Sequence, residues 1–120
     1  MEPRDIALLA ADAITDKKGD DILILDVEAL VGYAAYFVIA SARSERQVSA
    51  ISDHVVRQLR TTQQVRPLGT EGASRSKWAL IDFGDVVVHV FREDQREFYD
   101  LEGLWQDAPR VEYQPAVRSA

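Results

Sequence analysis

The chain has no cysteine among its 120 residues, which excludes disulfide bonds, thiolate metal ligands and cysteine nucleophiles. It also has no apolar run near the roughly 18 residues that a membrane-spanning helix needs. The first residues lack the basic-then-apolar order of a secretory signal, and the acids Glu2, Asp5 and Asp12 argue against an organellar transit peptide. These absences predict a single soluble domain in the cytoplasm, without a membrane partner.

Basic residues are scarce relative to acidic ones. Lys and Arg total 14 against 20 Asp and Glu, which gives a formal net charge of −6. Affinity for nucleic acid depends mainly on Lys and Arg that neutralise phosphates, so the charge disfavours RNA binding as the main function. An acidic domain is better suited to a basic protein partner, because opposite charges speed the encounter and favour one orientation.

Enzyme motifs are missing as well. The chain holds no Gly-x-x-x-x-Gly-Lys phosphate loop, no His-Glu-x-x-His zinc motif and only two histidines, His54 and His89. The rival class is a metal-dependent nucleotidyl or phosphoryl transferase, for which Asp82 and Asp85 stand close to His89. Such an enzyme needs converging carboxylates and a phosphate-binding element, but Asp85 falls in a turn and no Gly-Ser loop precedes it. The sequence therefore predicts no catalytic residue, no cofactor and no metal site.

Periodicity along the chain predicts an α+β domain. Helical spacing of apolar residues indicates three helices, and short runs rich in β-branched residues indicate five strands. The order predicts a single mixed five-stranded sheet with helices mainly on one face, so that the other face stays open. The expected elements are a helix between Pro3 and Gly19, strands over 21–27 and 35–41, a helix that Ser44 caps, a short edge strand over 63–68, hairpin strands over 78–83 and 86–91, and a helix over 93–105.

The stretch WALIDFGDVVVHVF, Trp78 to Phe91, predicts a β-hairpin. Its two strands flank Gly84-Asp85, and glycine supplies the positive φ that a two-residue hairpin turn needs. This turn places Trp78 opposite Phe91. Because side chains alternate across a strand, one face is purely apolar and the other is mixed. The apolar face carries Ala79, Ile81, Phe83, Val86, Val88 and Val90, and the mixed face carries Trp78, Leu80, Asp82, Val87, His89 and Phe91.

The mixed face has two interpretations. In the first, its apolar residues are core beneath a helix, and His89 forms a structural hydrogen bond with the diagonal Asp82. In the second, it is a docking surface, because aromatic residues are enriched at interface hot spots and an acid among them can pair with a basic partner. The residues alone leave both interpretations open.

Several segments carry a resemblance to a known family. They are 36–41 (YFVIAS), Ser44 with 46–48 (RQV), 78–91, Phe98-Tyr99, Leu104-Trp105 and 107–109 (DAP). Through these segments the chain resembles the ribosomal silencing factor family, also called RsfS or Iojap-like, from about residue 6 to residue 109.

The resemblance implies a fold related to nucleotidyltransferases but without their activity. It implies a translational repressor that binds the large ribosomal subunit through its fourteenth universal protein, prevents the small subunit from joining, and also acts in large-subunit biogenesis. It implies a homodimer when the protein is free, and Arg110 and Arg118 allow a minor contact with rRNA. The silencing factor domain is expected over residues 1–109, and a flexible C-terminal tail over residues 110–120.

With this resemblance, docking becomes the favoured interpretation of the mixed face of the hairpin. Phe98, Tyr99 and Trp105 are expected to pack the last helix and not to touch a partner. The predicted partner-binding residues are Trp78, Leu80, Asp82, Val87, His89 and Phe91.

Overall fold

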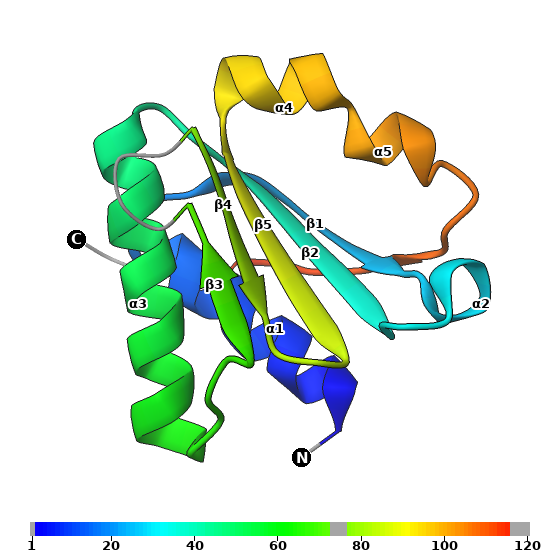
Figure 1. Cartoon of the computed structure of the whole chain (residues 1–120), viewed down its shortest axis with the longest axis horizontal. Helices are drawn as coiled ribbons and strands as arrows, with labels where there is room; N and C mark the ends of the chain where they lie inside the picture. Colours follow the sequence, from blue (N-terminus) through cyan, green and yellow to red (C-terminus); the bar gives the residue numbers. More distant parts are fainter. Residues whose placement is uncertain (1, 73–76, 116–120) are drawn as a thin grey trace.

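The computed structural model describes residues 2–72 and 77–115 and contains one six-stranded sheet flanked by helices (Figure 1). The elements are α1 (Pro3–Asp16), β1 (Asp20–Asp26), α2 (Glu28–Val31), β2 (Tyr36–Ala42), α3 (Glu45–Gln63), β3 (Gly69–Glu71), β4 (Trp78–Asp82), β5 (Val86–Arg92), α4 (Glu93–Tyr99), α5 (Leu101–Leu104) and β6 (Arg110–Val111). The strand order is β3-β4-β5-β2-β1-β6. β2 and β5 run parallel and the other neighbours antiparallel, so the sheet is mixed, as predicted. None of the helices in this part of the chain is long and apolar enough to span a membrane.

Two long helices, α1 and α3, pack on one face of the sheet (Figure 1). The spacing seen in the sequence is confirmed in α3, where Val48, Ile51, Val55 and Leu59 are all buried. Alanines fill most buried positions of α1, and their small side chains let this helix approach its neighbours closely at native packing density. The apolar face of the hairpin lies in the same core, and its six predicted residues are buried: Ala79, Ile81, Phe83, Val86, Val88 and Val90.

The other face of the sheet is covered only in part. A second apolar cluster lies there, and its cover comes from short segments: Val31 of α2, Leu101 of α5 and Trp105 after it. These residues leave Trp78 and Leu80 partly exposed on the sheet. The face that the sequence predicts to be open is therefore covered in part by short segments.

The helix predicted over 93–105 is broken in two at Asp100. This residue has a φ of +46°, which ends α4, and its carboxylate then caps α5 by accepting a hydrogen bond from the Gly103 N–H at 3.1 Å. A Cβ at position 103 would collide with that carboxylate, so a larger residue there would displace the Asp100 side chain from its capping position. The break gives α5 a direction of its own (Figure 1).

The sheet has six strands where five were predicted, and the additional strand is β6. Its Val111 pairs with Ile24 and its Arg110 with Leu25 at the edge of the sheet. A strand of two residues shows no alternation of polar and apolar side chains, so periodicity could not reveal it. The segment predicted as a flexible tail thus begins with two residues that pair with β1, and residues 116–120 lie outside the described residues.

The edge strand predicted over 63–68 lies a few residues later. α3 continues to Gln63, and β3 begins only at Gly69, after Pro67. Proline has no N–H to give to a strand ladder, whereas the Leu68 N–H donates to the Asp82 carbonyl at 2.7 Å. The strand therefore begins where backbone donors become available.

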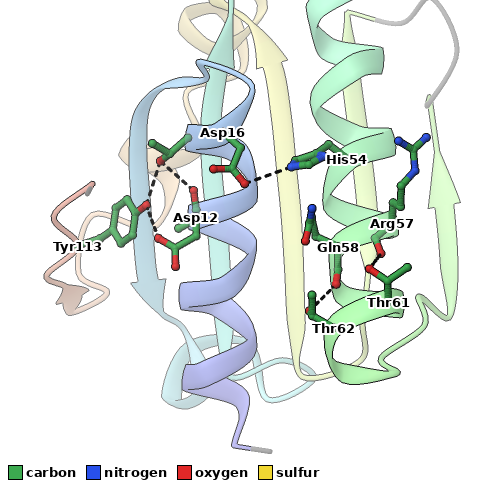
Figure 2. A network of polar contacts seen from close by, with 10 residues as sticks. Asp12, Asp16, His54, Arg57, Gln58, Thr61, Thr62 and Tyr113 are labelled. Carbon is green, nitrogen blue, oxygen red and sulfur yellow. Dashed lines mark hydrogen bonds and ion pairs between the residues drawn. The ribbon is translucent and has the colours of Figure 1, made fainter. Parts of the chain in front are cut away.

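The segment after β6 is fastened to α1 (Figure 2). The Tyr113 hydroxyl donates to the Asp12 carboxylate at 2.9 Å and lies 2.9 Å from Thr15 Oγ1. Beside it, His54 Nε2 of α3 lies 3.2 Å from Asp16 Oδ2 of α1. These contacts join both long helices and the C-terminal segment into one layer on the same face of the sheet.

Candidate functional site

The hairpin adopts the register that the sequence predicts. Trp78 lies opposite Phe91, Leu80 lies opposite His89, and the pairing continues without a shift towards the turn. Gly84 in the turn has a φ of +90°, the positive value for which glycine was expected. The six residues predicted to bind a partner therefore share one face of the sheet.

These six residues differ in how far they reach the surface. The three on β4 are partly exposed, so a partner can touch them. The three on β5 are buried, and Phe91 is buried completely. It lies against Trp78, with the ring centroids 4.8 Å apart. Phe91 is thus a core residue that supports the face, whereas the β4 residues are accessible on it.

A cleft of about 570 Å³ opens on this face. The hairpin supplies one side of it, including every predicted partner-binding residue except Phe91. The rest of the lining comes from loops and short helices, and three of its members are large apolar side chains with high exposure: Tyr33 at 67%, Leu68 at 78% and Leu104 at 67%. Exposed apolar side chains around one cleft are typical of interaction surfaces.

Sequence reasoning missed this rim. Tyr33 follows Gly32, Leu68 stands between Pro67 and Gly69, and Leu104 belongs to a helix of one turn. No helical or alternating pattern connects residues so far apart in the chain. These residues could have been found by another signal: each is a large apolar residue next to glycine or proline, where loops usually have polar residues.

The last helical segment contributes aromatic rings in two different ways. Trp105 packs edge-to-face on Phe37 of β2, with centroids 6.0 Å apart, as expected for a residue that fastens this segment. Tyr99 lies 4.8 Å from the Trp78 ring and is 47% exposed. The expectation is wrong for Phe98, which is 78% exposed.

His89 lies in the lining of the cleft and is neutral. Trp78 Nε1 donates a hydrogen bond to His89 Nδ1 at 3.3 Å, so the imidazole proton is on Nε2. Burial lowers the pKa of His89 from 6.5 to about 4, because the charged form would lose its hydration. Its Nε2 has no hydrogen-bond partner in the described part of the chain. The structural bond that one interpretation assigned to Asp82 is made with Trp78.

Asp82 is the one acid among the described residues that line the cleft. Its Oδ1 accepts a hydrogen bond from the Gly84 N–H at 2.7 Å, which fixes the carboxylate beside the turn. Asp85 lies exposed in the turn and is not part of the lining. In residues 2–72 and 77–115, no three His, Asp or Glu side chains are grouped as a metal site would require. The arrangement suits the binding of an apolar group beside a cation, and lacks the converging carboxylates of a phosphoryl transferase.

Arg96 fastens α4 and α5 against the sheet. Its Nε donates to the Glu102 carboxylate at 3.0 Å, and its Nη1 donates to the Asp21 carbonyl at 2.6 Å and to the Ser41 hydroxyl at 2.8 Å. The side chain is only 12% exposed. Arg96 therefore positions the segment that supplies one wall of the cleft.

The whole chain, residues 1–120, matches the family model described as "Ribosomal silencing factor during starvation". It is 38% identical over 117 residues to the ribosomal silencing factor RsfS of Halalkalibacterium halodurans, which covers 98% of this chain and 99% of that protein. It is 44% identical over 110 residues to the RsfS of Bacillus subtilis, with 91% and 92% covered. A crystal structure of a protein from Chromobacterium violaceum has a TM-score of 0.85 at 38% identity and covers 100% of this chain and 97% of that chain.

Proposed function

The chain belongs to the ribosomal silencing factor family, and on this premise we propose that it is a translational repressor that binds the large ribosomal subunit in the cytoplasm. In this proposal it docks on the fourteenth universal protein of that subunit and prevents the small subunit from joining. The proposal includes a further role in large-subunit biogenesis. It does not include a catalytic activity.

The observation that supports docking most strongly is the open cleft beside Trp78. Its walls are apolar, and its rim carries exposed leucine and tyrosine side chains. Tryptophan is enriched at the hot spots of interfaces. Trp78 contacts the rings of both Phe91 and Tyr99, each with centroids 4.8 Å away, so little side-chain entropy remains to be lost when a partner binds.

The chemistry of the cleft suits a basic protein. An apolar side chain of the partner can enter the cleft while a neighbouring Lys or Arg meets Asp82, which is the one acid of the described lining. The net charge of −6 adds attraction at longer range. Ribosomal proteins that contact rRNA need Lys and Arg to neutralise phosphates, so the fourteenth universal protein fits this description. Contact with rRNA itself is minor in this proposal.

The six predicted residues divide by role within the proposed interface. The partly exposed Trp78, Leu80 and Asp82 touch the partner. Of the buried residues of β5, Val87 and His89 line the cleft, and Phe91 packs beside Trp78 from the neighbouring strand. The rim residue Leu68 joins the contacting set because it is 78% exposed and lines the cleft.

Co-sedimentation with isolated large subunits tests the proposal. Leu68→Glu places a carboxylate in the apolar rim without disturbing the core, and we expect it to weaken binding about tenfold or more, because the charge is desolvated without a partner. Leu30→Glu is the matched control, since Leu30 is 46% exposed and lies outside the cleft lining. Equal loss of binding in both variants, or in neither, contradicts the assignment.

Two further variants test the residues on β4. Asp82→Lys reverses the charge of the cleft and is expected to abolish co-sedimentation, whereas Asp53→Lys makes the same change at an exposed position of α3 and is expected to keep it. Trp78→Ala also removes packing from Phe91, so its circular dichroism spectrum is recorded beside its binding. Normal co-sedimentation of folded Trp78→Ala and Asp82→Lys would exclude this face.

We also propose that the free protein is a homodimer. An open apolar cleft is unfavourable in water, and a second copy of the chain is a partner that is always at hand. Light scattering checks this: a dimer has twice the 13.5 kDa of the chain, and a mass of one chain at micromolar concentration speaks against it.

A further inference from the structure

The hydrogen bond between Trp78 and His89 lies on the open face of the sheet, where the cleft is lined by both residues. We propose that His89 is the positioning residue of the docking cleft, because its Nδ1 holds the Trp78 indole in the single orientation that forms the cleft wall. The benefit to binding rests on the proposed function, whereas the positioning itself is a property of the free protein.

Ring contacts and a hydrogen bond both act on the orientation of Trp78. The indole stacks on Phe91 with an interplanar angle of 25° and a centroid separation of 4.8 Å, and Tyr99 lies 4.8 Å away. Stacking fixes the plane of a ring, but a half-turn about the χ2 torsion keeps that plane and exchanges the two edges of the indole. The bond from Nε1 to His89 exists in only one of these orientations. It therefore stabilises the orientation in which Nε1 points to His89.

His89 can serve as a fixed acceptor because its own ring is held. It lies nearly parallel to Phe91, at an interplanar angle of 10° and a centroid separation of 6.1 Å. Phe37 of the neighbouring β2 meets it edge-to-face at 5.2 Å. With these rings on two sides and 6% exposure, the imidazole keeps its Nδ1 directed at the indole.

Stability does not explain an imidazole at this position. When Nδ1 accepts, the proton on Nε2 is a buried donor, and it has no hydrogen-bond partner in the described residues. A buried donor without a partner is unfavourable, and a contact with the edge or face of Phe37 offsets this only weakly. An apolar side chain of similar size avoids the problem but offers no acceptor to Trp78.

This difference separates positioning from packing. His89→Leu removes both the acceptor and the unpaired donor, so the protein is expected to keep or gain stability while Trp78 loses its fixed orientation. A merely structural role predicts the opposite, since stability and function then fall together. His89→Asn places an amide oxygen near the position of Nδ1 and is expected to restore the bond to Trp78.

The experiment uses the full-length chain as wild type, His89→Leu and His89→Asn. In the free protein, NMR records the Trp78 indole N–H, which Trp105→Phe distinguishes from the second tryptophan, and urea unfolding records stability. We expect the indole N–H of His89→Leu to exchange with solvent about fivefold faster or more, as for loss of one neutral hydrogen bond. Binding to isolated large subunits should weaken by a similar factor in His89→Leu, and by no more than about twofold in His89→Asn.

The outcomes are separable. An indole resonance that is unchanged in shift and exchange in His89→Leu overturns the positioning role. Loss of binding that only follows loss of stability, or a loosened indole with unchanged binding, overturns the role in docking. If wild-type protein fails to bind large subunits, the proposed function fails, and the indole measurement still decides whether His89 positions Trp78.

Discussion

Trp78, His89 and Phe91 form a triangular cluster of rings on the partly covered face of the sheet, with centroid separations between 4.8 and 6.1 Å. The hairpin register predicted that these side chains share a face, but it did not predict the hydrogen bond within the cluster. Trp78 and Asp82 are both diagonal neighbours of His89, because Leu80 lies directly opposite it. The Asp82 carboxylate accepts a hydrogen bond from the Gly84 N–H in the turn, which the sequence alone does not reveal. Trp78 is therefore the partner of His89.

Burial of a neutral His89 makes stability depend on pH. The unfolded chain takes up a proton at an ordinary histidine pKa of 6.5, whereas the pKa of folded His89 is about 4. Between these values the unfolded state binds more protons, so stability falls as the pH falls from 6.5 to 4. The shift corresponds to about 3 kcal/mol, and the stabilisation is fully present above pH 6.5.

Urea unfolding of wild type and His89→Leu at pH 7 and pH 4.5 checks this effect. The wild type should lose about 2 to 3 kcal/mol more than the variant over this interval. His54 and the carboxylates, including Asp82 in the same cleft, are present in both proteins and cancel in the difference. Parallel pH dependence in the two proteins would show that His89 titrates normally in the folded state.

At the scale of elements, periodicity located the helices better than it located their breaks. Phe98, Leu101 and Trp105 have helical spacing, so one helix was expected over 93–105. The break depends on a local competition, because the Asp100 side chain bonds the Gly103 N–H instead of leaving the backbone to continue. Phe98 is exposed near the end of α4, and α5 lines the cleft through Leu101 and Leu104. The helical spacing is real, but the cap at Asp100 interrupts the helix, so the prediction of one continuous helix was wrong.

Arg96 is the anchor of this broken segment, and its removal should loosen one wall of the cleft. Arg96→Ala gives up three hydrogen bonds from a guanidinium that is 12% exposed. We expect a loss of about 2 kcal/mol in the free energy of unfolding, as for charged hydrogen bonds. Binding to large subunits should weaken as well, because Leu101, Leu104 and Trp105 are held less firmly.

Arg57→Ala is the matched control for this change. Arg57 is an exposed arginine of α3 and does not line the cleft beside Trp78, so its replacement should leave both measurements nearly unchanged. Arg96→Lys keeps the charge but loses the guanidinium fork, so an intermediate result is expected. If Arg96→Ala unfolds at the same urea concentration as wild type, α4 and α5 are held by apolar packing alone.

At the scale of the whole molecule, the architecture follows from an unequal distribution of helices. The long helices α1 and α3 cover one face of a mixed sheet, and short segments cover part of the other. Strong apolar periodicity made the first layer predictable from the sequence. The strand β6 and the contact of Tyr113 with α1 could not be predicted in this way. Two paired residues and one tyrosine hydroxyl bonded to Asp12 leave no repeating pattern in the sequence.

The rim of the cleft is also a property of the whole molecule. Tyr33, Leu68 and Leu104 meet around Trp78 only after the sheet and the broken helical segment are assembled. The hairpin half of the site could be derived from alternation and turn chemistry, whereas the other half depends on tertiary structure. Binding through the proposed docking surface should therefore weaken when either half is altered.

Binding to the isolated fourteenth universal protein of the large subunit tests the central claim most directly. Wild-type protein and Leu30→Glu are titrated against it beside Leu68→Glu and Asp82→Lys. We predict saturable binding of the first two, at least about tenfold weaker binding of Leu68→Glu, and none of Asp82→Lys. The absence of wild-type binding, or equal binding by all four proteins, would contradict docking through this cleft.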